Sequence, residues 1–315
     1  MTRQDAIARF GTLAGGIIVF AGFSIASENF LTLANQLTIL RQVSFLLILA
    51  LGFTFALITS ELDLSFANVA SLCGVITGGL IHFGHSPLLA IGAGLVAGIM
   101  FGALNGVLVT QLKIPSLIAT LATASVARGL AFMATDGVAW VGRWDQNFVW
   151  LGRGRWLGMP VLVIWSAILA VIAWFVVAHT RFGVWLTATG EADEAARLAG
   201  IPIRRMKLWG LTLSGLFAAI SAILLTASLS SAGPTAAGDF LMSGIAAVLL
   251  GMTMFTPGKP NMAGTLVGSL VIGVLANGLV LVGAPYYVQD IALGVIILGS
   301  VAISASTLSK AAFGV

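Results

Sequence analysis

Long apolar runs recur along nearly the whole chain, and they constrain its fold more than any other feature. A helix that crosses a bilayer needs roughly 20 largely apolar residues. Ten runs approach that length: 10–26, 37–59, 66–81, 88–109, 115–134, 161–178, 208–229, 240–256, 262–283 and 288–306. Only 8% of the 315 residues are charged and 59% are hydrophobic, whereas soluble domains carry about 25% charged residues. The sequence therefore predicts an all-α polytopic membrane protein with about ten transmembrane helices.

The distribution of lysine and arginine predicts which loops face the cytoplasm, because basic residues gather in cytoplasmic loops. With the N-terminus inside, ten basic residues fall on the cytoplasmic side and four on the outer side. The ten are Arg3, Arg9, Lys113, Arg181, Arg197, Arg204, Arg205, Lys207, Lys259 and Lys310, and the four are Arg41, Arg143, Arg153 and Arg155. Both termini are then cytoplasmic, which requires an even number of spans. Nine or ten spans fit the runs, because 66–81 and 240–256 are short enough to be tilted, broken or re-entrant.

A single transmembrane domain is expected to occupy residues 1–315, with two sizeable loops. Residues 135–160 form the predicted outer loop, and residues 179–207 form the predicted cytoplasmic coupling loop. The sequence lacks the phosphate-loop pattern G-x-x-x-x-G-K-[ST], and its histidines lack metal-ligand spacing. The net charge of +4 is too small to indicate nucleic-acid binding. We therefore expect no metal site, no nucleotide site and no catalysis in this chain itself.

The cytoplasmic loop contains a segment, 189–202, with the start and stop signals of a short helix. Thr189 can cap its N-terminus, the acidic residues that follow suit the positive end of the helix dipole, and Gly200 can adopt the left-handed conformation that ends a helix. Its alanines offer little area to bury in lipid, whereas a small, smooth helix suits a groove on a partner protein. We favour docking over resting on the membrane. The predicted coupling residues are Glu191, Glu194, Ala195, Ala196, Arg197 and Gly200.

The same segment also resembles a known family. Glu194-Ala-Ala-Arg-Leu-Ala-Gly-Ile201, followed by basic residues and Leu213-Ser-Gly-Leu216, is similar to the cytoplasmic loop of the ribose-type sugar permeases, the membrane subunits of bacterial ABC importers. Leu62-Asp-Leu-Ser65 resembles the Ile-Asp-Leu-Ser segment of that family, and 113–129 resembles its run ending in Arg-Gly. Two departures stand out. Ser60-Glu61 replaces paired glycines, and 255–260 replaces a glycine-rich loop.

The resemblance implies a division of labour among several chains. A separate ABC ATPase would bind ATP and magnesium, and a periplasmic solute-binding protein would deliver a sugar or sugar-like solute. A second permease copy or a paralogue would complete the pathway across the bacterial inner membrane, in contact with its lipid. This chain would bind no cofactor. Branched-chain amino acids and nucleosides are the alternative solutes, and an ion-driven secondary transporter or a membrane-embedded enzyme is the alternative class of protein.

Polar residues within or beside the spans are the candidates for a solute path. Asp63 and Ser65 follow the second predicted span, where either can cap the next helix or line the path. Polar groups inside spans can face a sugar, although they more often hydrogen-bond to a neighbouring helix. The candidates inside spans are Asn105, Thr120, Ser125 and Asn277.

Glycines at four-residue intervals mark one face of the run 88–109. Such a stripe lets another helix approach until the two backbones touch. We therefore predict a packing seam, either within the subunit or between two copies. The glycines are Gly94, Gly98, Gly102 and Gly106.

Overall fold

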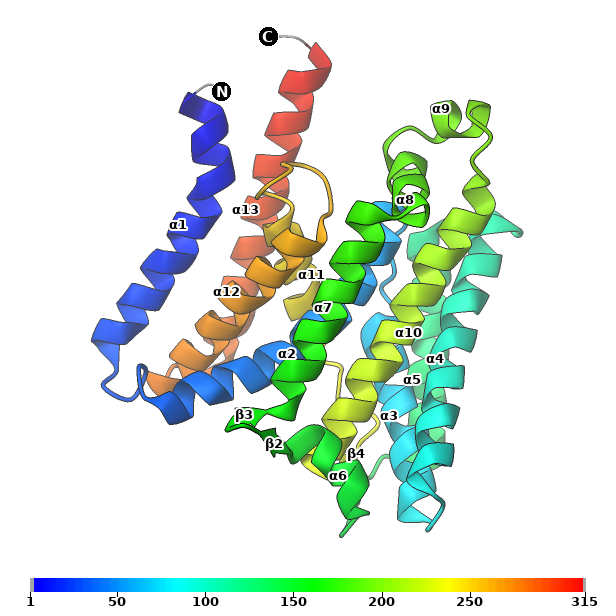
Figure 1. The fold of residues 1–315 in the computed structure, drawn as a ribbon, viewed down its shortest axis with the longest axis vertical. Helices are drawn as coiled ribbons and strands as arrows, with labels where there is room; N and C mark the ends of the chain where they lie inside the picture. Colours follow the sequence, from blue (N-terminus) through cyan, green and yellow to red (C-terminus); the bar gives the residue numbers. More distant parts are fainter. Residues whose placement is uncertain (1–2, 314–315) are drawn as a thin grey trace.

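The computed structural model describes the backbone of residues 3–313 and the side chains of residues 13–302. It is a bundle of helices with a few two-residue strands at one end (Figure 1). The helices are α1 (Arg3–Ala26), α2 (Leu33–Ile58), α3 (Phe66–His82), α4 (Pro87–Thr110), α5 (Ser116–Thr135), α6 (Gln146–Arg153), α7 (Val161–His179), α8 (Arg181–Glu191), α9 (Asp193–Leu198), α10 (Ile203–Leu229), α11 (Phe240–Gly251), α12 (Met262–Leu281) and α13 (Tyr286–Phe313). The strands are β1 (Trp140–Val141), β2 (Arg155–Trp156), β3 (Met159–Pro160) and β4 (Ser231–Ala232).

Six of the described helices are long and apolar enough to cross a membrane: α2, α4, α5, α7, α10 and α12. Shorter apolar stretches lie in α1, α3, α11 and α13. Helix α11 has 12 residues, which is about 18 Å at the helical rise of ~1.5 Å per residue. The hydrocarbon core is about 30 Å thick. The runs 66–81 and 240–256 are therefore short helices, as the sequence predicts, and α11 cannot cross the bilayer unaided.

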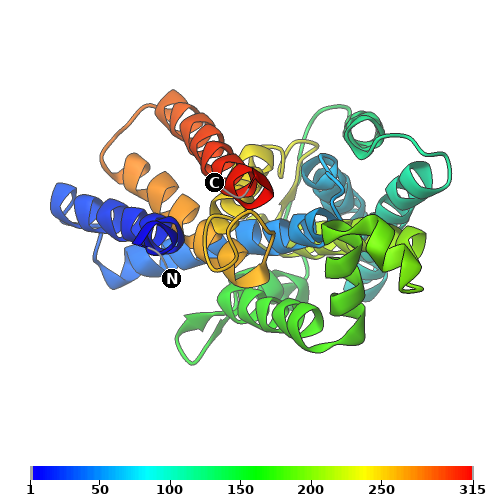
Figure 2. The ribbon, with the colours of Figure 1, turned by 90° about the horizontal axis from the view of Figure 1, so that it is seen from above.

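Helices α2 and α10 form the centre of the bundle. In the most apolar stretch of each helix, 83% of the residues are buried in α2 and 72% in α10, whereas only 22% are buried in α4. Helix α10 packs against α2, α3 and α4, and Figure 2 shows α2 crossing the molecule between α7 on one side and α13 on the other. Hydroxyl pairs join the buried helices, because lipid offers no partner for a polar group: Thr54 meets Thr265 at 2.7 Å, and Ser166 donates to Ser44 at 3.1 Å.

The glycine stripe of α4 packs against α10 of the same chain, which decides the question that the sequence leaves open. A Cβ at Gly102 would lie 2.6 Å from the carbonyl oxygen of Leu211. A Cβ at Gly106 would lie 2.9 Å from the side chain of Leu208, and Gly98 faces the backbone of Gly215 equally closely. Gly94 continues the stripe toward α3, where it faces Thr77. The seam therefore lies within the subunit.

Short strands and α6 close one end of the bundle. Strand β1 pairs antiparallel with β4, so that Trp140 lies opposite Ala232, and β2 pairs antiparallel with β3. Asp145 caps α6 by accepting hydrogen bonds from two backbone amides of its first turn. Phe148 of that helix is fully buried, and Gly152 abuts the backbone of α10. The predicted outer loop 135–160 is thus an ordered cover for this end of the bundle.

The opposite end carries α8 and α9, together with the start of α1 and the end of α13 (Figure 1). Both ends of the described backbone therefore lie on one side, as an even number of crossings requires. The side chains of Arg3, Arg9 and Lys310, which contribute to the predicted charge bias, lie outside the described residues.

Candidate functional site

The predicted coupling loop folds as two short helices, and its first helix differs from the prediction. Thr180 caps α8 by accepting from the amide of Gly183 at 3.2 Å. Thr189 lies in the last turn of α8, where its buried hydroxyl donates to the carbonyl oxygen of Trp185 at 2.8 Å. The prediction that Thr189 caps the docking helix is therefore wrong, because that hydroxyl is already bonded within the preceding helix. Helix α9 begins at Asp193 without a side-chain cap.

The second helix, α9, matches the rest of the prediction. Asp193 and Glu194 occupy its first turn, and Gly200 ends it with a φ of +80°, in the left-handed region that glycine adopts without strain. Ala196 is buried, whereas Ala195 is exposed. The exposed face of this helix is thus free for a partner protein.

The charged residues on α9 and at the end of α8 differ in their ion pairs. Arg197 and Glu194 approach to only 3.9 Å and are largely exposed, so their attraction contributes little to stability. Glu191 belongs to α8 instead of α9, and its carboxylate pairs with Lys259 at 2.8 Å. That pair ties α8 to the connection between α11 and α12. Glu194 and Arg197 therefore remain available to a partner, whereas Glu191 is engaged within the subunit.

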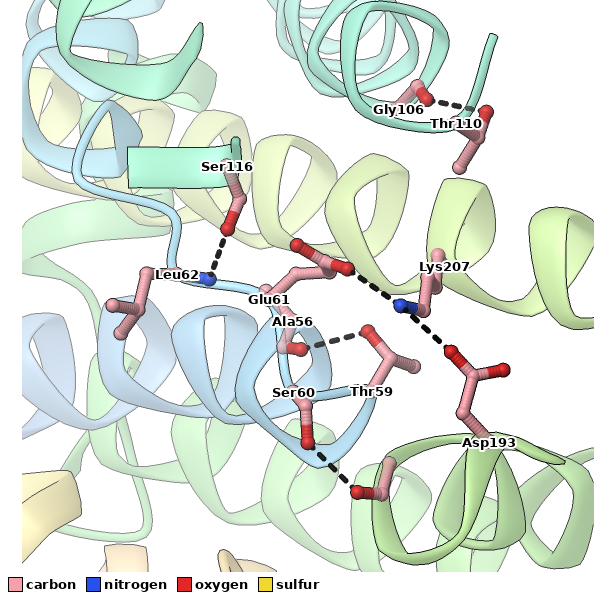
Figure 3. Close-up of polar contacts among 11 residues, drawn as sticks. Ala56, Thr59, Ser60, Glu61, Leu62, Gly106, Thr110, Ser116, Asp193 and Lys207 are labelled. Atoms are coloured by element: carbon pink, nitrogen blue, oxygen red, sulfur yellow. Dashed lines mark hydrogen bonds and ion pairs between the residues drawn. The ribbon is translucent and has the colours of Figure 1, made fainter. Parts of the chain in front are cut away.

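A lysine links α9 to the segment that follows α2. The ammonium group of Lys207, in the first turns of α10, lies 3.0 Å from the carboxylate of Glu61 and 3.4 Å from that of Asp193 (Figure 3). The side chain of Glu61 is only 10% exposed. Removing a carboxylate from water is costly unless a charge partner compensates, so Lys207 is the group that permits Glu61 at this position. The cluster Glu61–Lys207–Asp193 joins three elements by charge.

The segment 59–65 has no regular secondary structure, and side chains satisfy its backbone. Ser116 accepts from the amide of Leu62 at 3.1 Å (Figure 3), and the hydroxyl of Thr120 bridges the amide of Leu64 and the carbonyl of Leu62. Irregular backbone inside a membrane protein requires such partners. The hydroxyl of Ser60 donates to the carbonyl oxygen of Gly190 in α8 at 2.8 Å. Helices α5 and α8 therefore hold this segment in place.

A buried chain of hydrogen bonds runs inward from the same segment. Asp63 accepts from the amide of Ser65 at 2.9 Å and from its hydroxyl at 2.5 Å. The side-chain amide of Asn105 in α4 donates to the same hydroxyl at 2.8 Å, and Thr123 of α5 donates to the side-chain oxygen Oδ1 of Asn105 at 2.6 Å. The second carboxylate oxygen of Asp63 is buried and has no hydrogen-bond partner among the described residues, and the same holds for the hydroxyl of Ser214 in α10. The structure thus gathers Asp63, Ser65 and Asn105 in one cluster.

The other predicted path residues lie elsewhere or play a local part. Thr120 joins the cluster through segment 59–65. Asn277 exchanges two amide hydrogen bonds of 3.0 Å with Asn35, and Ser125 is exposed on α5, where it donates to the carbonyl of Leu121. The hypothesis that Ser65 caps α3 with its side chain is wrong, because its hydroxyl points to Asp63. That these residues line a solute path stays a prediction.

Sequence reasoning missed the role of Lys207, which entered only as a positive charge near the membrane. The residue that could have indicated this role of Lys207 is Glu61. A carboxylate in an otherwise apolar, membrane-embedded segment needs a nearby cation, and Lys207 is a cation at the start of a later span. The distance of 146 positions along the chain conceals the pair, because only the packing of α10 beside α2 brings the two groups together.

Membrane-length helices around a buried polar cluster define a multi-pass membrane protein. A family model described as the branched-chain amino acid transport system / permease component matches residues 35–301. The chain belongs to this family and is a multi-pass inner-membrane protein.

Curated relatives match along most of their length. The ribose import permease RbsC of Escherichia coli (strain K12) is 37% identical over 285 residues, which cover 90% of this chain and 89% of the relative. RbsC of Bacillus subtilis (strain 168) is 38% identical over 292 residues, 92% of this chain and 90% of the relative. The L-arabinose ABC transporter permease AraH of Azospirillum brasilense is 34% identical, covering 93% and 86%. The resemblance to the ribose-type sugar permeases is confirmed.

Proposed function

We propose that this chain is the permease subunit of a bacterial ABC importer that translocates a monosaccharide or a similar polyol. The observation that carries the proposal is identity of 33–38% with ribose and arabinose permeases over nearly the whole chain. The excess of basic residues on the end that carries α8 and α9 supports a cytoplasmic location for that end and for both termini. Ten membrane-embedded helices, of which α11 is too short to cross alone, would then form a single domain.

The chain would work with partners that supply energy and solute. An ABC ATPase, with ATP and magnesium bound on it, would dock against the exposed face of α9, where Glu194, Ala195 and Arg197 are accessible. Leu198 is 87% exposed on the same helix and would serve as an apolar anchor. A solute-binding protein would deliver the sugar at the opposite end, and a second permease copy or a paralogue would complete the path. The chain itself would bind no cofactor.

Movement of α9 would reach the membrane interior through the charge cluster. A shift of Asp193 alters the position of Lys207, and Lys207 is bonded to Glu61 at the start of the irregular segment 59–65. This segment ends in the hydrogen-bonded chain of Asp63 and Ser65, which contacts α4 and precedes α3. Closure of the ATPase around ATP would thus displace α3 relative to α4 and α5, which opens or closes the path.

Purification of the tagged chain from native membranes tests the proposal. We expect a stoichiometric ABC ATPase to co-purify in mild detergent, identified by mass spectrometry. Cells that express the complete system should take up labelled ribose or L-arabinose, and an excess of leucine should not compete. Uptake driven by an ion gradient in liposomes that contain the chain alone would overturn the proposal in favour of a secondary transporter. Competition by leucine would assign the branched-chain amino acids instead.

A further inference from the structure

A cavity of about 300 Å³ lies at the end of the bundle opposite α8 and α9, between α2, α11, α12 and α13. We call it the outer cavity. It is separate from the buried cluster around Asp63, and none of the predicted path residues lines it. Its lining residues are Gln42, Leu46, Ala236, Asp239, Phe240, Ser243, Ile272, Gly273, Ala276, Val280 and Gln289.

The polar side chains of this lining have no partner among the described residues. Asp239 occupies the cap position of α11, where a carboxylate normally accepts from the first amides of the helix, yet it makes no such bond. Ser243, one turn further along, is only 7% exposed and also lacks a hydrogen bond. Gln42 from α2 and Gln289 from α13 face the cavity in the same unpaired state. Asp239 and Gln42 are exposed and Gln289 is half-buried, so these side chains are open to a molecule that enters the cavity.

Several other polar groups in the bundle are hydrogen-bonded to a neighbouring helix. The hydroxyl of Thr54 bonds to Thr265, that of Ser221 donates to the carbonyl of Phe45, and Asn277 is paired with Asn35. These three polar groups are thus paired within the bundle, whereas the buried hydroxyls of Thr77 and Ser214, which lie outside the cavity, have no hydrogen-bond partner among the described residues. Polar side chains from three elements that converge on one cavity without pairing are arranged for a ligand.

The chemistry of the cavity suits a polyol. A carboxylate accepts hydrogen bonds from sugar hydroxyls, two amides both donate and accept, and a serine hydroxyl does either. The aromatic ring of Phe240 and the aliphatic side chains of Leu46 and Ile272 provide an apolar wall for the C–H face of a sugar ring. A volume of about 300 Å³ is at the lower end for small-molecule sites, which favours one sugar ring over an oligosaccharide.

We propose that the outer cavity is a monosaccharide-binding site of the permease, in which Asp239, Gln42, Gln289 and Ser243 hydrogen-bond to the sugar as it enters from the periplasmic side. This inference rests on the proposed function and names the residues that hold the solute. It also assigns selectivity to the permease itself, in addition to its binding protein.

Cysteine protection tests the site directly, because the chain contains only one cysteine, Cys73, and that residue is fully buried. In a Cys73→Ala background, Ala276→Cys places a thiol at the cavity wall. A membrane-impermeant maleimide added to intact cells should label it, and ribose or L-arabinose at ten times its Kd should slow the labelling about tenfold by mass action. Ser86→Cys, exposed between α3 and α4 at the same end, should label without protection.

Uptake kinetics provide a second readout. Asp239→Asn and Gln42→Leu should each raise the KM for the transported sugar about tenfold, with the amount of co-purified ATPase unchanged. Asp290→Asn is the matched control, since Asp290 neighbours Gln289 on α13 but does not line the cavity. If the parent transports sugar, yet Ala276→Cys is unprotected and both variants keep the parental KM, the site is refuted and the proposed function stands. If the parent transports no sugar, the proposed function itself fails.

Discussion

At the scale of single residues, Glu61 distinguishes this chain from the family pattern it otherwise follows. Ser60 and Glu61 replace paired glycines. Ser60 still adopts a φ of +60°, the left-handed conformation that glycine accepts readily. The hydroxyl of Ser60 bonds to α8, and the carboxylate of Glu61 bonds to Lys207. The side chains at these two positions thus attach segment 59–65 to the coupling loop, Ser60 through Gly190 of α8 and Glu61 through Lys207.

Removing the cation of this pair should destabilise the protein markedly. Lys207→Met leaves the carboxylate of Glu61 buried without a partner, which costs about 3 kcal/mol, and should lower the thermal unfolding midpoint in detergent. The double variant Glu61→Gln/Lys207→Met should regain most of that loss, because neither charge remains. As a control, Lys259→Met breaks a pair that is about half exposed and should cost at most about 1 kcal/mol. Equal midpoints for the single and double variants would contradict the buried pair.

At the scale of elements, the contact between α4 and α10 depends on the absence of side chains. Gly98 and Gly102 of α4 lie so close to the backbone of α10 that a Cβ at either position would collide with it. Van der Waals contact of this kind holds membrane helices together, since burial from water does not drive their association. The position of α10 fixes Lys207 and Ser214, so the seam also positions the candidate site.

A methyl group in the seam should separate the two helices. Gly102→Ala would place Cβ 2.6 Å from the carbonyl of Leu211 and 2.8 Å from Cα of Thr212, and overpacking of this kind costs about 1–3 kcal/mol. Thermal unfolding of the purified chain measures the loss. Gly92→Ala, on the same helix with nothing within 4 Å, should be neutral or stabilising, since alanine favours helices by about 1 kcal/mol over glycine. If Gly102→Ala and Gly92→Ala changed the thermal unfolding midpoint equally, the packing seam would be disproved.

The exposed charge on helix α9 leads to a separate prediction about ATP-coupled uptake. Glu194→Lys, or deletion of 192–198, should abolish ATP-coupled uptake and co-purification of the ATPase while membrane insertion is retained. The reason is that Glu194 is exposed on the face offered to the partner, and reversing its charge disturbs complementarity. Glu28→Lys reverses an exposed charge in the connection between α1 and α2, at the other end of the bundle, and should leave coupling unchanged. Full coupled uptake by Glu194→Lys would rule out the docking role.

At the scale of the whole molecule, orientation follows from charge. Basic residues gather on the end with α8, α9 and the 252–261 connection, and α6 and the short strands lie at the other end (Figure 1). In the Cys73→Ala background, Thr256→Cys should resist an impermeant maleimide in intact cells and label after permeabilisation. Ser86→Cys should label in intact cells. The reverse pattern would invert the proposed orientation.

The sequence by itself determined the class of fold and the family. These features are local: hydropathy over about 20 residues, a helix stop at Gly200, and motifs in order along the chain. The short third and eighth runs were predictable because length is also a local property. The predicted start of the docking helix was wrong, because Thr189 is bonded inside a helix that its neighbours extend.

Only the tertiary structure decided which distant groups meet. Glu61 and Lys207, Asn105 and Ser65, and the glycines of α4 and the carbonyls of α10 become neighbours through the packing of α10 between α2 and α4. The same packing determines whether a polar residue in a span is paired, as Asn277 is, or faces a cavity, as Ser243 does. A polar side chain in an apolar run needs a partner or a ligand in either case, and the sequence does not show which one its neighbours in space supply.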